Sequence, residues 1–422
     1  MTVRRGEDPM FPMRPVVLGA FVPSLIFEIG VGAMLPIVAI TAIQLGASLA
    51  VAGVMAALLA VGQILVDVPA GSLAARLGDR GAMILAGLLA AAGFIGCALA
   101  PNLALLAVSV LAIGGANAVY NLARHAYLTE ITPPLRRARV LSTLAGVHRI
   151  GLFIGPFAGA AVIHGGDVQH GYWLAVGTSL AATAVLLAVP PERTGEPGRP
   201  GGRGTTTAPG AVAGRPAPRM AEVFRTHRRV FASLGLAVLL VGATRGARQT
   251  VLPLWGEHIG LDPAVISLVF GLAGGMDMLL FYPAGKVMDQ FGRLWIGIPA
   301  TITMGVALLV LPLTTTVASV SVVAALLGLG NGMSSGILMT LGADAAPESG
   351  RSQFLGIWRL FQDTGAAAGP LVVAAGAAVG SLALGIAAMG VVSFGAAGAL
   401  GRWVPWWSVH ANRTTRRRAG LD

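Results

Sequence analysis

The chain has 422 residues, of which 55% are apolar and only 11% are charged. A soluble domain has about 25% charged residues, because its surface faces water. The composition therefore excludes a string of soluble domains and predicts a protein whose solvent is largely lipid. A bilayer-crossing helix needs about 20 apolar residues, so a dozen spans would use roughly 240 residues.

Apolar segments bounded by polar or Gly/Pro breaks predict twelve helices. In chain order we expect them near 14–40, 47–72, 81–100, 103–128, 138–163, 170–190, 230–256, 262–286, 293–313, 317–342, 351–378 and 381–401. They form an N-terminal six-helix bundle, 14–190, and a C-terminal six-helix bundle, 230–401. Residues 1–13 and 402–422 are expected to be cytoplasmic tails, the second one basic. Residues 191–229, rich in Gly, Pro and Arg, predict a disordered cytoplasmic linker.

The net charge of +11 could indicate a nucleic-acid partner, but the basic residues lie on one side of the twelve predicted spans. The loops on the opposite side contain no Lys or Arg. Cytoplasmic loops of membrane proteins collect such residues, so both termini are expected in the cytoplasm. No A-x-A-like site precedes the first apolar segment, and no cleavable signal is expected. We expect a monomer in a bacterial cytoplasmic membrane, with the lipid bilayer around it and no nucleic-acid partner.

The two halves match at an ungapped offset of 214 residues. The matched positions are Pro69-Ala70-Gly71 with Pro283-Ala284-Gly285, Gly78 with Gly292, Asn117 with Asn331, and Gly151, Gly155 and Pro156 with Gly365, Gly369 and Pro370. One offset that aligns helices 2–5 with helices 8–11 predicts two bundles related by an axis along the membrane normal. In secondary transporters built this way, the binding site lies between the halves near the midplane.

The loop between helices 2 and 3 contains a recognisable signature. Its residues Gly71, Arg76, Gly78, Asp79 and Arg80 resemble the G-x-x-x-D-R-x-G-R-R signature of the major facilitator superfamily, and Gly285, Asp289, Gly292 and Arg293 form a second copy. The resemblance covers essentially the whole chain. It implies an all-α membrane protein of twelve transmembrane helices in two six-helix bundles related by a pseudo-twofold axis.

In that family the signature loop is thought to latch the cytoplasmic side through charge pairs. The first copy has Ala75 where the signature has aspartate, and the second has Gln290 where it has arginine. We therefore expect the second copy to contribute more of the gate. The alternative is that Gly71 and Gly78 only permit a tight turn.

Helix 5 has a second signature. Its residues Gly151, Gly155, Pro156 and Gly159 resemble the motif associated with the family's antiporters, and Gly365, Gly369 and Pro370 repeat it in helix 11. Glycines four residues apart allow close helix packing, and proline favours a kink. The resemblance implies antiport, with helix 5 sealing the interface between the halves. Packing alone is the alternative, and the repetition in helix 11 supports it.

An ionisable residue at bilayer depth is a functional candidate, because its burial is costly. The expected proton-coupling acids are Glu28, Asp67, Asp277 and Asp363, and the expected substrate-cavity residues are Asn117, Tyr120, Arg124, Arg149, Arg245, Arg248, Asn331 and Arg359. Glu28 is the leading proton carrier, because an acid that alternates between dry surroundings and an arginine can bind and release a proton. A permanent salt bridge to Arg245 or Arg124 is the alternative.

The repeat also predicts pairs. In the family, helix 5 faces helix 8 and helix 2 faces helix 11, and Arg149 and Asp277 lie at depths that agree within about 3 Å. We therefore predict that Arg149 contacts Asp277, mirrored by a contact of Gln63 with Asp363. Such a pair either fastens the halves or acts as a breakable gate. Glu130 with Arg137, and Asp344 with Arg351, are expected to hold the cytoplasmic loops.

Together these features predict a proton-driven secondary transporter, not an enzyme, that exports small amphipathic compounds by alternating access. We expect it to use the proton gradient and no cofactor, because no phosphate-binding loop is present and the histidines lack metal-ligand spacing. The alternatives are a proton-coupled uptake symporter for an organic anion or sugar, and a lipid or lysolipid transporter that opens laterally.

Overall fold

The computed structural model describes residues 16–133, 136–163, 167–189, 220–334, 336–347 and 349–420, and this part of the chain is almost entirely helical. The N-terminal half contains a π-helical turn η1 (Val17–Phe21), α2 (Val22–Met34), α3 (Ile37–Gln44), α4 (Leu49–Ala98), α5 (Leu103–Ile131), α6 (Arg137–Ile163) and α7 (Gln169–Ala188). The C-terminal half contains α8 (Met220–Thr226), α9 (Arg228–Val230), a π-helical turn η3 (Phe231–Gly235), α10 (Leu236–His258), α11 (Pro263–Phe291), α12 (Leu294–Val310), a 3-10 turn η4 (Leu311–Leu313), α13 (Val317–Met333), α14 (Ile337–Ala345), α15 (Arg351–Ala378), α16 (Leu382–Trp407) and α17 (Arg413–Arg418).

Eleven helices in the described residues are long and apolar enough to cross a membrane. Two of these spans lie in α4, Leu49–Asp67 and Pro69–Ala98, and the backbone of α4 turns sharply at Gly78. The twelfth predicted span is α15, whose 28 residues extend about 42 Å. Its mean hydropathy is lower because Arg359, Gln362 and Asp363 lie in its central part. The fold is the expected one of two six-helix bundles.

The backbone repeats at the offset found in the sequence. The π-helical turns η1 and η3 begin at Val17 and Phe231, which are 214 residues apart. The left-handed glycines Gly46 (φ 87°) and Gly78 (φ 73°) recur at Gly260 (φ 75°) and Gly292 (φ 104°). Because glycine adopts positive φ without steric cost, these positions end corresponding helices in the two halves.

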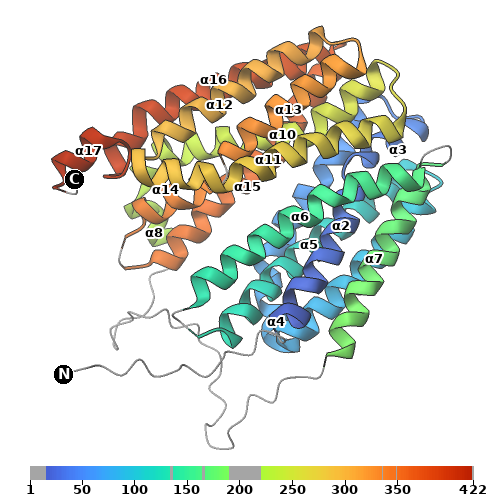
Figure 1. Ribbon diagram of the computed structural model, residues 1–422, viewed down its shortest axis with the longest axis horizontal. Helices are drawn as coiled ribbons and strands as arrows, with labels where there is room; N and C mark the ends of the chain where they lie inside the picture. The colour runs from blue at the N-terminus through green and yellow to red at the C-terminus, as the bar shows by residue number, and fades with distance from the viewer. Residues whose placement is uncertain are drawn as a thin grey trace, which may run out of the picture.

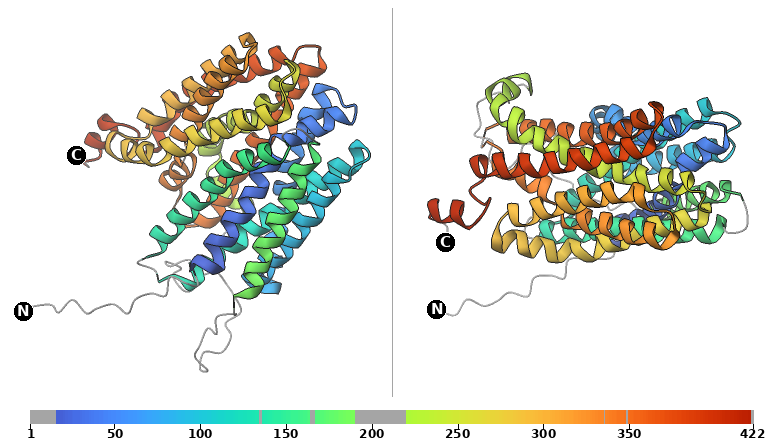
Figure 2. Two further views of the ribbon diagram at one scale, coloured as in Figure 1. Left: turned by 45° about the vertical axis from the view of Figure 1, so that its right-hand side comes forward. Right: turned by 90° about the horizontal axis from the view of Figure 1, so that it is seen from above.

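The helices of each half pack in the same order. In the N-terminal half α2 packs on α6 and α7, as α10 packs on α15 and α16 in the C-terminal half, and α4 packs on α5 as α11 packs on α13. The halves meet where α6 packs on α11 and where α4 packs on α15; we call these two contacts the seams. Figures 1 and 2 show the two bundles side by side, with α3 against the C-terminal half.

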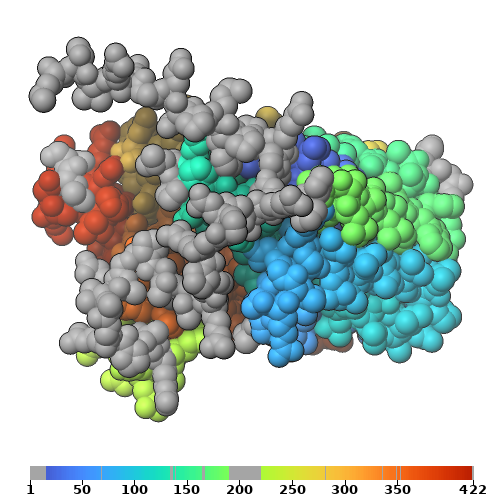
Figure 3. Space-filling model, turned by 90° about the horizontal axis from the view of Figure 1, so that it is seen from below, coloured from blue at the N-terminus to red at the C-terminus, as the bar shows by residue number. Residues whose placement is uncertain are grey.

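The halves pack closely at the end where α3 lies and separate toward the opposite end. Near the α3 end, a Cβ on Gly53 of α4 would lie 3.1 Å from Ala374 of α15 and 3.4 Å from Leu254 of α10. Near the opposite end, a Cβ on Gly285 would have no neighbour within 4 Å. The ribbons diverge toward α8 and α14 (Figure 1), and in Figure 3, seen from below, the C-terminal half lies to the left and most of the N-terminal half to the right. The space between the halves therefore opens at the end where α8 and α14 lie, and we call this arrangement the open-ended conformation.

Two segments differ from the sequence prediction. Helix α8 lies within 191–229, where we expected a disordered linker, and it folds because Val223 is buried and Phe224 stacks on Phe231 at 5.5 Å. The predicted C-terminal tail begins inside α16 and continues into α17, whose N-cap Asn412 forms a capping box with Thr415. The expected N-terminal tail, 1–13, and residues 190–219 lie outside the described residues.

Candidate functional site

Glu28 of α2 lies at the centre of a buried cluster. Its side chain is 0% exposed, and its Oε1 accepts a hydrogen bond of 2.8 Å from Nη1 of Arg124 on α5. The same oxygen lies 2.7 Å from Nδ1 of His148 on α6. Its Oε2 is buried and has no hydrogen-bond partner among the described residues. The cluster therefore contains a carboxylate with one oxygen in contact with both Arg124 and His148 and the other oxygen without a hydrogen bond in the described residues.

His148 was not among the residues that the sequence predicted for the site. Its side chain is 32% exposed, so it lies between solvent and the fully buried Glu28. Its Nδ1 is also 3.2 Å from Nη2 of Arg124. The signal in the sequence was a pair of adjacent polar residues, His148-Arg149, in the middle of an apolar helix.

A second network crosses the seam between α6 and α11. Nη1 of Arg149 donates to Oδ1 of Asp277 at 2.9 Å, as the sequence predicted. The other oxygen, Oδ2, accepts a 2.7 Å bond from Nδ2 of Asn331 on α13. Asn331 Oδ1 in turn accepts a 2.9 Å bond from Nε of Arg245 on α10. The chain of contacts joins one helix of the N-terminal half to three helices of the C-terminal half.

The two networks meet on one turn of α6. His148 contacts the acid of the N-terminal half, and its neighbour Arg149 contacts the acid of the C-terminal half. A rotation or shift of this turn would change both contacts together. One turn of α6 therefore contacts the buried acid of the N-terminal half and an acid of the C-terminal half.

The other seam has a different pairing from the predicted one. No hydrogen bond joins Gln63 to Asp363 within the described ranges, so that mirror prediction is wrong. Asp363 instead pairs with Arg359 one turn away on α15, at 3.4 Å. Arg359 also reaches Asp67 of α4 at 4.0 Å, across the seam. Asp363 therefore has Arg359 as its partner in place of Gln63, and the long side chain of Arg359 also reaches Asp67.

The remaining cavity candidates differ in their surroundings. Asn117 is buried and accepts a 2.8 Å bond from Nδ2 of Asn121. Tyr120 is buried and stacks on Phe27 with ring centroids 4.2 Å apart. Arg248 is only 8% exposed, and its Nε has no partner among the residues described. Asn117 and Tyr120 therefore support the wall of the N-terminal half, whereas Arg248 has a buried Nε with no hydrogen-bond partner in the described residues.

The first copy of the loop signature has no charge pair with the C-terminal half in the described part of the chain. Arg76 is exposed, and Asp79 has Glu130 as a like-charged neighbour. Arg80 donates from Nη2 to the carbonyl oxygens of Leu186 and Val189 at the end of α7. This copy therefore fastens loop and helix within its own half in this conformation.

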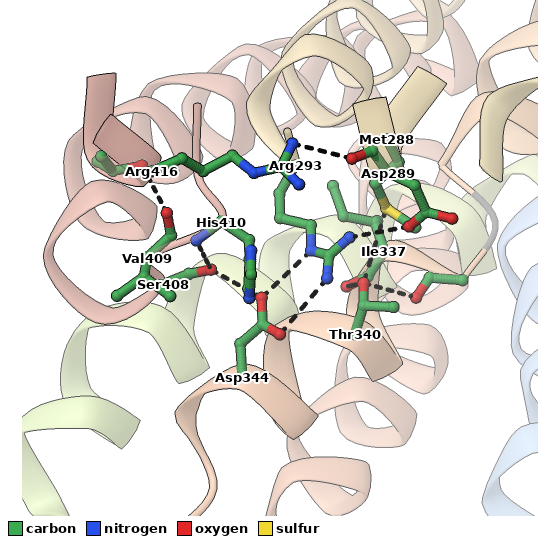
Figure 4. A network of polar contacts seen from close by, with 12 residues as sticks. Met288, Asp289, Arg293, Ile337, Thr340, Asp344, Ser408, Val409, His410 and Arg416 are labelled. Atoms are coloured by element: carbon green, nitrogen blue, oxygen red, sulfur yellow. Dashed lines mark hydrogen bonds and ion pairs between the residues drawn. The ribbon is translucent and has the colours of Figure 1, made fainter. Parts of the chain in front are cut away.

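The second copy is bound by the chain's own C-terminal segment (Figure 4). Nε of Arg293 lies 3.2 Å from Oδ2 of Asp344, and the same oxygen accepts a 2.7 Å bond from Ser408. The backbone N–H of Arg293 donates to the carbonyl of His410, and Nη1 of Arg416 donates to that of Asp289. Asp289 itself contacts Arg293 at 3.4 Å. We call Ser408–Arg418 with these contacts the C-terminal clasp.

The predicted loop pairs are therefore wrong in both halves. Asp344 pairs with Arg293, not with Arg351, because the turn after α16 and the start of α12 meet at Asp344. Arg137 donates from Nε to the carbonyl of Thr132 at the end of α5, so it does not pair with Glu130. A basic side chain commonly satisfies the last carbonyls of a helix in this way.

The glycines of helix 5 pack within the N-terminal half. A Cβ on Gly151 would lie 2.6 Å from the Cβ of Glu28, and one on Gly155 would lie 2.5 Å from the carbonyl of Ile29. In α15, a Cβ on Gly369 would lie 2.0 Å from the carbonyl of Ala243 on α10. The motif therefore brings α6 against α2, and α15 against α10. The expected seal between the halves is corrected accordingly, because these glycines face away from the seams.

The fold and these networks define a multi-pass membrane transporter built from two repeated halves. A family model described as Major Facilitator Superfamily matches residues 20–370. The chain therefore belongs to the major facilitator superfamily. No curated protein matches its sequence.

Several solved structures share the fold at low sequence identity. A POT family transporter in complex with 5-aminolevulinic acid has a TM-score of 0.73 and 13% identity, over 93% of this chain and 96% of that one. The nucleoside transporter NupG has a TM-score of 0.72 and 10% identity, over 91% and 98%. A D-xylose-proton symporter has a TM-score of 0.64 and 14% identity, over 93% and 97%. At these identities the likeness shows the fold and leaves the substrate open.

Proposed function

We propose that the protein is a proton-coupled secondary transporter that exports small amphipathic compounds by alternating access of its two halves. The observation that supports coupling most strongly is Glu28, which is fully buried and has one free carboxylate oxygen. A buried carboxylate is tolerated only while it is paired. Arg124 and His148 supply that pairing in this conformation.

The cluster suggests how a proton could be exchanged. If α5 or α6 shifted, Glu28 would lose Arg124 or His148 and could remain buried only as the neutral acid. His148 is the cluster member that solvent reaches, so it is the route by which a proton would arrive or leave. Because Arg149 follows it on the same turn, breaking the Arg149–Asp277 contact would disturb His148 as well.

Two features of the structure bear on the direction of transport. The helix 5 motif resembles that of antiporters, but its glycines serve packing of α6 on α2. The second candidate is a proton-coupled uptake symporter for an organic anion. The excess of guanidinium groups around Asp277 favours it, since Arg149, Arg245 and Arg248 gather near this single carboxylate. For either direction we propose a cytoplasmic-membrane monomer with both termini in the cytoplasm.

A transport assay separates these candidates. Proteoliposomes with the cytoplasmic face toward the lumen are tested with three probes that share an aromatic ring and differ in charge: p-toluenesulfonate, p-toluenesulfonamide and benzyltrimethylammonium. For export by antiport, acid outside accelerates the loss of a probe from the lumen. Uptake into the lumen under the same gradient would identify a symporter. Probe movement that ignores the pH gradient would contradict proton coupling.

A further inference from the structure

Two arginines of α10 lie on one face of the helix near the middle of the membrane. Arg245 and Arg248 are three residues apart, so their side chains emerge from the same side. Arg248 lies ten residues before the end of α10 at His258, a depth of about 15 Å, which is half of a hydrocarbon core of about 30 Å. This depth is where substrate sites of two-halved transporters lie.

The acids near these arginines are already engaged. Both oxygens of Asp277 are bound, Oδ1 by Arg149 and Oδ2 by Asn331. Arg245 donates to the neutral carboxamide of Asn331, not to a carboxylate. Glu28, the buried acid of the N-terminal half, is held by Arg124 and His148. Three guanidinium groups thus lie near one occupied carboxylate.

Arg248 shares the carboxylate of Asp277 with two other arginines and forms no ion pair of its own in the described residues. It is 8% exposed, it interacts electrostatically with Asp277 and with the like-charged Arg149, and no hydrogen bond to its guanidinium is found in the described residues. An unpaired buried charge is strongly disfavoured, so a fixed cation at this depth calls for a counter-anion. Guanidinium groups bind planar or tetrahedral oxyanions through paired N–H bonds, which lysine cannot do.

The neighbouring wall is apolar. A cavity of about 20 Å³ next to this turn of α10 is lined by Met34, Leu35 and Leu59 of the N-terminal half and by Gln249 and Thr250 of α10. Arg248 does not line it, but the cavity shows that the N-terminal half presents apolar side chains to the residues that follow Arg248. We propose that Arg248, assisted by Arg245, binds the carboxylate or sulfonate head of a small organic anion, and that this anion is the transported substrate. The proposal rests on the transporter function proposed above.

Binding in nanodiscs of zwitterionic lipid tests this directly. Calorimetric titration with p-toluenesulfonate and p-toluenesulfonamide compares an anion with a neutral molecule of the same shape. We expect the wild-type protein to bind the sulfonate at least tenfold more tightly. Arg248→Gln should weaken sulfonate binding by about 10- to 100-fold, the range for a charged hydrogen bond, and Arg248→Lys should recover only part of it. Arg228→Gln, at the exposed cytoplasmic end, is the matched control.

The unliganded variants give an independent readout. Arg248→Gln removes an unpaired buried charge. It should therefore raise the unfolding temperature of the protein without ligand, while it lowers the affinity for the sulfonate. Equal binding of the two probes, no binding of either, or an unchanged affinity in Arg248→Gln would overturn the proposal. The proposal would also be overturned if phosphatidylglycerol, and not the sulfonate, raised the unfolding temperature of the wild-type protein. That result would assign the arginines to lipid binding. If the protein bound no anion but still transported another probe in response to a pH gradient, the anion proposal would be wrong and the proposed proton coupling would be unaffected.

Discussion

Nη1 of Arg149 lies 2.9 Å from Oδ1 of Asp277, and this contact joins two residues on opposite halves of the molecule. The side chains are 19% and 16% exposed, so the pair is neither fully buried nor freely solvated. A pair in such surroundings can be broken without leaving two dry, uncompensated charges. It can therefore open and close as the halves move.

A double-mutant cycle measures the strength of this contact. Arg149→Gln and Asp277→Asn should each lower the free energy of unfolding, and the double variant should lose less than their sum. We expect a coupling of about 1 kcal/mol, as for polar contacts between membrane helices. Reversible unfolding in bicelles provides the measurement. Arg228→Gln combined with Asp277→Asn should be additive, and additivity in the Arg149 cycle as well would contradict an energetic link.

His148→Gln tests the proposed proton route. The amide fits the site and cannot relay a proton, so pH-driven transport of p-toluenesulfonate should slow at least about tenfold, within the range for losing a proton-transferring group. Exchange of labelled for unlabelled probe without a gradient should continue. His170→Gln, at the N-terminal end of α7, is the control. A His148→Gln variant with the pH response of the wild type would remove this histidine from the route.

Gly155→Ala tests the packing of α6 on α2. The new methyl group would lie 2.5 Å from the carbonyl of Ile29 and 2.7 Å from the backbone nitrogen of Ala33, so the helices must separate. We expect a loss of about 1–3 kcal/mol in the free energy of unfolding. A methyl group on Gly146 of the same helix would have no neighbour within 4 Å, so Gly146→Ala should be neutral or stabilising by up to about 1 kcal/mol. If the two variants changed the free energy of unfolding equally, α6 would not pack on α2 through the face that contains Gly155.

Asp344→Asn tests the C-terminal clasp. Asp344 is 14% exposed and binds both Arg293 and Ser408, so losing its charge should cost about 1–3 kcal/mol. Trypsin should then cleave faster after Arg413 and Arg416, because the segment is released. Asp289→Asn is the matched control: Asp289 is 76% exposed beside the same arginine, where a pair is worth about 0–1 kcal/mol. Similar cleavage rates in the two variants would contradict the clasp.

The sequence predicted the features that depend on spacing along the chain. The offset of 214 residues predicted the repeated backbone turns at Gly78 and Gly292. Arg149 and Asp277 lie at similar distances from the ends of their helices, and in the family that the sequence resembles these two helices face each other. The two observations together predicted that Arg149 contacts Asp277. These features follow from helix rise and topology alone.

Other features depend on which way a side chain faces, and an apolar helix gives little sign of that. The approach of His148 to Glu28 requires the rotation of α6 about its axis, which no polar face reveals. The glycines of α6 indicated a close neighbour and not its identity, which is α2. Asp344 has the partner Arg293 because the turn at Ser408 folds back, a contact between segments that spacing does not encode.

The central claim is that Glu28 exchanges the coupled proton, and its most direct test compares two modes of transport in one preparation. Proteoliposomes of wild type, Glu28→Gln and the control Glu257→Gln are assayed for probe exchange without a gradient and for movement driven by a pH gradient. We predict that all three exchange the probe and that only Glu28→Gln loses the response to the gradient. A Glu28→Gln protein that still moves the probe in response to the pH gradient, as the wild type does, would contradict the account.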